Sequence, residues 1–248
     1  MKLSGNTNIN EDFLLTVKGS CVEIRFTKDM SNEECLEKLA RRIYPSDLRR
    51  YSVNGYNNDI PFKSECHLYV EDKETEKRKL VAILAIIFFN EGVLEENDDI
   101  TDIGEELTYW ADTADQDTYD AINALTHHKI FTQKIKKEIK EKFTPFFTLY
   151  IEHLYVMPKF RNRGYGSFLF EYLPQIVGMF TGAAIRAAVI TPVPQKYIKG
   201  KWSTEDNNEE MQNKMIKLLE KYNYKLIAGM PGSDGDAPQY AQNFANSL

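Results

Sequence analysis

The sequence has little of what marks several protein classes. Its 248 residues include three cysteines, Cys21, Cys35 and Cys66, and no CxxC pair. An odd number without paired spacing does not suit a disulfide framework, so we expect a reducing compartment. The longest apolar run, residues 80–89, has about half the length that a bilayer crossing needs. Residues 1–12 are polar and hold no signal core, so we expect a cytoplasmic protein without a membrane partner.

Metal ligands and excess basic charge are also scarce. Four histidines occur, and the adjacent pairs Cys66-His67 and His127-His128 have no second pair of ligands at metal-binding spacing. We therefore expect no metal. The formal net charge is −6, whereas proteins that bind nucleic acid usually present a basic face. We therefore expect no nucleic-acid partner.

The residues that are present are typical of a globular α/β protein. Hydrophobic residues make up 42% and aromatic residues 12% of the chain. Ser31, with Glu34 three residues later, has the pattern of a helix N-cap. Period-two and apolar runs predict strands at residues 21–26, 67–71, 80–89, 146–156, 184–190 and 224–228, with a weaker one from Tyr240. Helices are predicted from residue 31 and at 164–177 and 209–222, a short helix and a loop at 45–65, and a loop at 191–208.

Residues 91–145 interrupt this pattern between the third and fourth predicted strands. From Glu91 to Asp120 the chain holds twelve acidic residues and no Lys or Arg. The mostly basic residues 129–142 follow, and their apolar positions have helical spacing. We predict two or three inserted helices. The acidic stretch is either a solvated helical face or a surface that attracts a cationic substrate.

The most informative segment is residues 149–167. A strand leads into a short turn, after which Arg161, Arg163, Gly164 and Gly166 open a helix. The free N–H groups of a helix N-terminus bind phosphate, glycines let the backbone approach closely, and arginines add charge for a pyrophosphate. The segment suits a diphosphate-bearing cofactor, although a GxG also fits a plain strand-to-helix turn. The fingerprints GxGxxG, whose last position holds Leu169, and GxxxxGKS are absent.

The pattern Val156-x-Pro158-x-x-Arg161-x-x-Gly164-x-Gly166 resembles motif A of the GNAT superfamily of N-acetyltransferases. Residues 150–156 resemble the fourth strand of that family, most of all in its polyamine-type members. The resemblance implies the acyl-CoA N-acyltransferase fold: an α/β protein with a mixed, mostly antiparallel splayed sheet flanked by helices. Residues 1–248 would form a single N-acetyltransferase domain with a helical insertion at 91–145. The implied reaction moves an acetyl group from acetyl-CoA to a primary amine by direct attack in a ternary complex.

The resemblance also implies a binding site for acetyl-CoA. The backbone of Leu154, Tyr155 and Val156 would pair with the pantetheine arm. Strand 184–190 would part from strand 146–156 to open a slot for the thioester. The loop that would hold the pyrophosphate comprises Arg161, Asn162, Arg163, Gly164, Tyr165, Gly166 and Ser167.

Glu152 is the candidate catalytic residue. An amine must be neutral to attack, so a carboxylate that takes its proton directly or through water is useful. Glu152 shares a strand face with Val156, and the family often has a glutamate here, as base or as amine contact. The alternative is a solvated strand glutamate. His153 points to the other face, where we expect it to pack.

The sequence departs from the family where the tyrosine that protonates the leaving thiolate is expected. Leu219 occupies that position, so Tyr222 or Tyr197 could substitute, or the thiolate could leave unaided. Asn223 replaces a glycine and is tolerable there because Asn accepts the left-handed conformation.

The acceptor amine is not identified by the sequence. A cationic acceptor fits the acidic stretch, either as a polyamine-like compound or as a lysine-rich segment. Two other hypotheses stay open: a catalytically inert acyl-CoA-binding sensor or interaction module on the same fold, and a protein acetyltransferase whose insertion docks a partner. A homodimer also stays open.

Overall fold

The computed structural model describes residues 9–18, 20, 22–40, 51–52, 61–71, 75, 77–92, 102–132, 135, 137, 146–204, 208–229 and 237–245. The strands are β1 (Phe13–Val17), β2 (Glu23–Phe26), β3 (Tyr51–Ser52), β4 (Phe62–Glu71), β5 (Arg78–Asn90), β6 (Phe146–Val156), β7 (Ala184–Ile190), β8 (Gln195–Ile198), β9 (Lys201–Thr204), β10 (Lys225–Ala228) and β11 (Gln239–Asn243). The helices are α1 (Asn32–Leu39), α3 (Ile103–Asp112), α4 (Gln116–Thr126), α5 (Lys129–Thr132), α7 (Tyr165–Glu171), α8 (Leu173–Thr181) and α9 (Glu209–Lys221), with a 3-10 turn η2 (Pro158–Phe160).

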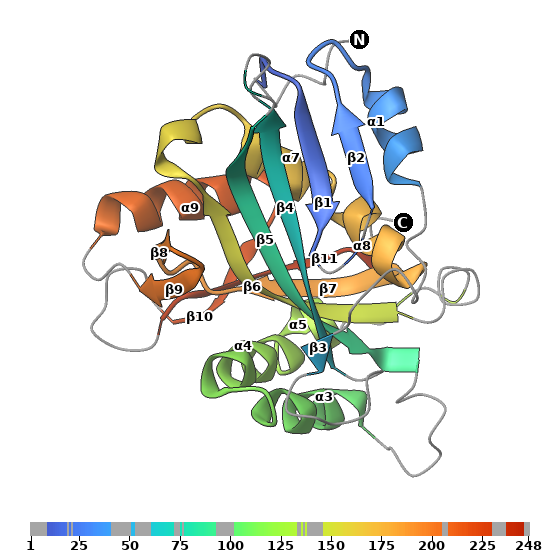
Figure 1. Ribbon diagram of the computed structural model, residues 1–248. Coiled ribbons are helices and arrows are strands. Elements are labelled where there is room, and N and C mark those ends of the chain that lie inside the picture. Colours follow the sequence, from blue (N-terminus) through green and yellow to red (C-terminus); the bar gives the residue numbers. More distant parts are fainter. Residues whose placement is uncertain are drawn as a thin grey trace. The chain divides into compact units, whose positions relative to one another are not determined.

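The chain is an α/β protein with a mixed, mostly antiparallel open sheet (Figure 1). Its hydrogen-bonded strand order is β10-β11-β7-β6-β5-β4-β1-β2, with β3 paired to β4 and a separate β8–β9 hairpin. Helices α3, α4 and α5 lie in the chain between β5 and β6. Of the predicted insertion 91–145, residues 93–101, 133–134, 136 and 138–145 lie outside the described residues. None of the helices in the described part of the chain has the length and apolarity that a bilayer crossing requires.

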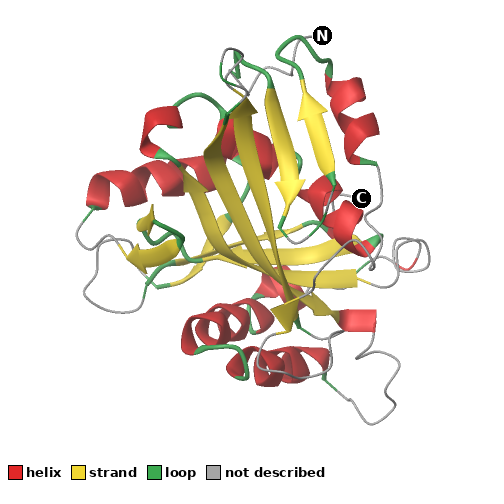
Figure 2. Ribbon diagram, in the orientation of Figure 1, coloured by secondary structure: helices red, strands yellow, loops and turns green. Residues whose placement is uncertain are grey.

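The chain divides into two compact units. Figure 2 shows its helices and strands by colour. The first comprises Met1–Tyr51, Ser64–Ala85 and His153–Gly182. The second comprises Ser52–Lys63, Ile86–Glu152 and Ala183–Leu248. Strands β4, β5 and β6 therefore contribute residues to both units.

An aromatic cluster forms the core of the first unit. The rings of Phe13 and Phe26 stack with centroids 4.9 Å apart, and Phe168 meets them edge-on at 4.9 and 5.1 Å. Burying aromatic rings of this size stabilises a core by a few kcal/mol each, roughly 1.5–3 for a phenylalanine. Ser31 caps α1 as predicted, because its hydroxyl accepts from Glu34 N–H while the Glu34 carboxylate accepts from Ser31 N–H.

The second unit packs α3, α4 and α5 with strand residues around one apolar cluster. Ala121, Ile122 and Leu125 on one face of α4 are fully buried in it, together with Tyr150 and Val189. Strand β7 pairs parallel with β6 and antiparallel with β11. One face of α4 is therefore fixed to the core, and the opposite face is left for other contacts.

A buried ion pair lies beside this cluster. The side chain of Glu91 is 2% exposed, and its carboxylate accepts from Arg186 Nη1 at 2.8 Å and Thr148 Oγ1 at 2.6 Å. The Arg186 guanidinium also lies 3.9 Å from the centroid of the Phe131 ring and donates to Phe131 O at 3.0 Å. Arg186 thus joins β7 to α5 and to the end of β5.

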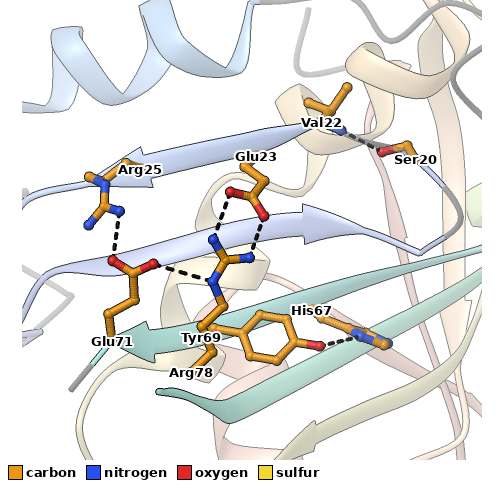
Figure 3. A network of polar contacts seen from close by, with 8 residues as sticks. All are labelled: Ser20, Val22, Glu23, Arg25, His67, Tyr69, Glu71 and Arg78. Carbon is orange, nitrogen blue, oxygen red and sulfur yellow. Dashed lines mark hydrogen bonds and ion pairs between the residues drawn. The ribbon is translucent and has the colours of Figure 1, made fainter. Parts of the chain in front are cut away.

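We expect Arg186→Met to lower the free energy of unfolding by about 3–5 kcal/mol, because it removes one partner of a buried ion pair and leaves the Glu91 carboxylate buried. Chemical denaturation monitored by circular dichroism measures this change. Arg78→Met is the matched control, since Arg78 pairs with Glu23 and Glu71 on an exposed sheet face of the first unit (Figure 3). Water screens that pair, so the control should change stability far less. Equal losses in the two variants would contradict the assigned role of Arg186.

Several sequence predictions are wrong in detail. Strand β1 was not predicted, because its short run of buried residues shows no alternation, and the first predicted strand, residues 21–26, begins only at Glu23 in β2. The predicted helix and loop at 45–65 is wrong at residues 51–52 and 62–65, which are strand; residues 45–50 and 53–60 lie outside the described residues. The insertion consequently lies between the fifth and sixth strands in chain order.

Two further corrections follow from local chemistry. The helix predicted at 164–177 is broken at Tyr172, because Pro174, the second residue of α8, cannot supply the N–H that a continuous helix needs. The loop predicted at 191–208 contains the β8–β9 hairpin. Its turn residues, Lys199 and Gly200, both have positive φ, as a tight hairpin turn requires.

Candidate functional site

The pairing of β6 with β7 ends partway along β6. Their parallel register runs from Phe146↔Ala184 to Ile151↔Ile190, and β6 then continues to Val156. Pro192 and Pro194 follow Thr191 after the end of β7 and lack the N–H groups that would extend the ladder. Beyond Ile151 this edge of β6 is therefore not paired with β7.

A tight turn follows β6 in the first unit. The 3-10 turn η2 leads to Asn162 with φ 63° and Gly164 with φ 91°, and Gly164 is the N-cap of α7. Glycine adopts this conformation without strain, and Asn tolerates it better than most residues. The first intrahelical bond runs from Phe168 N–H to Gly164 O at 2.9 Å. The N–H groups of Tyr165, Gly166 and Ser167 therefore lie at the open start of the helix.

The two arginines of this turn have different surroundings. Arg161 Nε donates to Val156 O at 3.0 Å, and its guanidinium lies 5.6 Å from the Tyr155 ring centroid, so Arg161 ties the turn to the end of β6. Arg163 is half exposed and contacts Glu11 at 3.3 Å. Its charge is thus already shared with a carboxylate.

Tyr165 is buried and supports the turn from within. Its hydroxyl donates to Glu11 Oε1 at 2.7 Å. Burial, together with this bond, raises the pKa of Tyr165 well above its usual range, so the hydroxyl stays protonated. Among the predicted pyrophosphate-binding residues, Tyr165 has a structural side chain, whereas the N–H groups at the start of α7 are open. These groups fit a diphosphate.

A pocket of about 460 Å³ lies wholly within the second unit, and it includes Glu152. This volume is in the range of small-molecule sites. Strand β6 contributes Tyr150 and Glu152, whereas α4 contributes Asp117 and Asp120. The remaining lining residues are Asn123, Ala124, Thr191, Val193, Gln195, Thr204, Ala228, Gly229, Ala237 and Gln239.

The acids of α4 enter the pocket because of helical spacing. Asp117, Asp120 and Ala124 follow one another at three and four residues and share one helix face, which is opposite the buried Ile122. Gln116 Nε2 donates a hydrogen bond to the Asp120 carboxylate at 2.7 Å. The sequence singled out the acidic stretch as a whole but did not predict these two residues. The signal available in the sequence was the helical spacing, which puts these acids on one face and apolar residues on the opposite face.

Other acids of the same stretch have structural roles. Asp102 caps α3 by accepting from Gly104 N–H and Glu105 N–H, and Asp115 caps α4 by accepting from Thr118 N–H. Glu91 belongs to the buried ion pair described above. The stretch is therefore not a uniform solvated face.

Glu152 is one-fifth exposed and forms an ion pair with Lys63 of β4. Phe62, the residue before Lys63 on β4, shows which face of the sheet each side chain occupies. Its ring stacks on that of Phe88 with centroids 4.6 Å apart and meets the Phe147 ring edge-on. Because successive strand side chains alternate, Lys63 lies on the opposite face, the one that Tyr150 and Glu152 share. Glu152 is also the first residue of β6 past the last pair with β7. It is therefore not a freely solvated glutamate.

A chain of neutral polar groups lines the pocket wall near Glu152. Tyr150 is 5% exposed, and its hydroxyl contacts Thr191, which in turn donates to Gln239 Oε1 at 2.6 Å. Burial raises the pKa of Tyr150 well above its usual range. The phenol therefore stays neutral and can only exchange hydrogen bonds with a ligand.

Leu219 stands where the sequence resemblance would place a tyrosine. Its aliphatic side chain is 1% exposed, packs in the core and offers no proton donor. Asn223 has φ 63°, which confirms the predicted left-handed helix end. Tyr197 lies on β8 with its ring 4.6 Å from that of Trp202, and Tyr222 follows α9. Neither lines the pocket that contains Glu152.

Comparison of the chain with known proteins does not add a relative. No protein-family model matches it, and no curated protein matches it. A function for this chain must therefore be inferred from its own residues and their arrangement.

Proposed function

We propose that this protein is an acetyl-CoA-dependent N-acetyltransferase that acetylates a primary amine. The observation that carries the proposal is the end of the β6–β7 ladder at Ile151↔Ile190, with a carboxylate, Glu152, on the next residue of β6. A thioester entering along β6 past this point would meet that carboxylate. The left-handed turn at Asn162 and Gly164, between β6 and α7, supports binding of the diphosphate.

In the proposed reaction the backbone at Leu154, Tyr155 and Val156 pairs with the pantetheine arm of acetyl-CoA. Glu152 holds the acceptor ammonium and takes a proton from it, directly or through water. The neutral amine attacks the thioester carbonyl carbon, the C–S bond breaks, and CoA leaves as the thiolate. The Tyr150 hydroxyl, being neutral, accepts a hydrogen bond from the ammonium of the acceptor.

The pocket favours a small cationic acceptor. Three carboxylates, from Asp117, Asp120 and Glu152, line a volume of about 460 Å³ together with neutral amide and hydroxyl groups. A second ammonium group on the acceptor would be attracted to the α4 acids while the first reacts at Glu152. A polyamine-like compound fits this pocket better than a lysine within a folded partner.

A panel of acceptors tests the proposal. Products formed from acetyl-CoA with small monoamines, diamines and lysine peptides are to be identified by mass spectrometry. We expect acetylated diamines to form fastest. Peptide acetylation without any small-molecule product would favour the protein acetyltransferase instead.

We expect the double variant Asp117→Asn, Asp120→Asn to raise the acceptor KM by about tenfold, the scale of one charge contact at a partly exposed site. The KM for acetyl-CoA should stay unchanged. The acceptor KM of the unmodified protein should also rise with salt, and the variant should lose most of this dependence. Steady-state kinetics at two ionic strengths provide the measurement.

The matched control is the double variant Glu105→Gln, Asp112→Asn on the neighbouring helix α3. It removes the same charge from acids that do not line the pocket. Its acceptor KM should equal that of the unmodified protein. If both double variants behave alike, the α4 acids have no part in choosing the acceptor.

A further inference from the structure

The ion pair between Lys63 and Glu152 places an amine of the chain itself beside the proposed base. The Lys63 side chain is 26% exposed and that of Glu152 is 20% exposed, so both charges are largely withdrawn from water. Lys214 and Glu210 on α9 form an ordinary surface pair by comparison, at 53% and 81% exposed. The Lys63 ammonium thus has the position relative to Glu152 that the acceptor's ammonium needs.

The backbone fixes this position. The stacking of Phe62 on Phe88 holds β4 at Lys63, and alternation directs the Lys63 side chain to the face of Glu152. Glu152 directly follows Ile151, the last residue paired with β7. The Lys63 amine therefore lies at the end of the ladder, where the proposed reaction puts the acetyl group.

We propose that Lys63 is a site of self-acetylation in cis, an inference that rests on the proposed function. Glu152 takes a proton from the Lys63 ammonium, and the neutral Nζ attacks the carbonyl carbon of acetyl-CoA. The Nζ–C bond forms and the C–S bond breaks. The CoA thiolate takes the second proton that Nζ loses. One acetyl-CoA is consumed, and one proton passes to solvent through Glu152.

Acetylation would change the site that performs it. An acetylated lysine is a neutral amide, so its ion pair with Glu152 is lost. The Glu152 carboxylate would then lose the lysine cation that competes with an external ammonium. Modification of Lys63 in this way would favour binding of the acceptor in the pocket.

The test is incubation of the full chain with acetyl-CoA and no acceptor, followed by intact mass measurement and peptide mapping. We expect one acetyl group on Lys63, added with a rate constant that does not depend on protein concentration. Lys214 in the same digest reports non-enzymatic acetylation and should gain far less. Lys63→Arg keeps the charge and should remove the added mass. Glu152→Gln should abolish the modification of Lys63 while leaving Lys214 as before.

Other outcomes overturn the inference in distinguishable ways. If external amines are acetylated but Lys63 gains no more than Lys214, the self-acetylation is refuted and the proposed function stands. A rate that grows with protein concentration refutes the cis reaction. If acetyl-CoA neither binds nor is consumed, the proposed function itself fails and the inference falls with it.

Discussion

Replacing Glu152 with Gln should lower kcat for amine acetylation by about 100-fold or more at neutral pH, the usual scale for loss of a general base. Gln keeps the size and hydrogen-bonding capacity of the side chain but cannot accept the proton of the amine. It also ends the ion pair with Lys63, which is one reason to measure folding alongside activity. Steady-state kinetics and a thermal melt on the same preparation separate the two effects.

The matched control for Glu152 is Glu210→Gln. It also removes the acid of a Glu–Lys ion pair, but on the exposed surface of α9. Its kcat should equal that of the unmodified protein. If Glu152→Gln turns over at the unmodified rate with its fold intact, Glu152 is only a partner of Lys63 and has no role in proton transfer.

Replacing Gly164 with Val should abolish binding of acetyl-CoA and CoA. Gly164 has φ 91°, a conformation that a β-branched residue adopts only with strain, and its Cβ would stand at the start of α7, where backbone N–H groups are to meet the diphosphate. Calorimetric titration with CoA measures the loss directly. The effect combines strain with a steric block, so it needs a control that has the strain alone.

Gly200→Val provides that control. Gly200 has φ 82° in the β8–β9 turn, and a Cβ added there would meet nothing within 4 Å. Both variants should lose comparable stability, on the order of 1–3 kcal/mol for a strained left-handed residue. Gly200→Val should keep the CoA affinity of the unmodified protein, whereas Gly164→Val should lose it. Unchanged affinity in Gly164→Val would refute the assignment of the turn to the diphosphate.

Helices and strands were predicted correctly where the hydrophobic pattern and the length of a run indicated the same type of element. Strands β6 and β7 match their predicted residues, since each is a long apolar run that ends at a clear turn signal. The N-cap at Ser31 and the left-handed Asn223 were also predicted correctly, because each depends on chemistry within a few residues. The β8–β9 hairpin was missed because its turn, Lys199-Gly200, lacks the common Asn-Gly or Asp-Gly signal.

The candidate site could be predicted only in part. Glu152 was identifiable from its place on β6, but its pairing with Lys63 joins residues far apart in sequence and follows from the order of strands in the sheet. Asp117 and Asp120 meet Glu152 in one pocket for the same non-local reason. Glu91 was counted in the acidic stretch, for which both alternatives were surface roles, although it comes soon after a buried run and has a buried partner, Arg186.

Release of free CoA thiol from acetyl-CoA, measured with and without a small diamine, decides whether the protein is an N-acetyltransferase. We expect thiol release that depends on the amine, saturates with it, and falls by about 100-fold in Glu152→Gln, the scale of a lost general base. Calorimetric binding of acetyl-CoA with no thiol release from any amine would instead identify an inert acyl-CoA sensor and refute the proposed function.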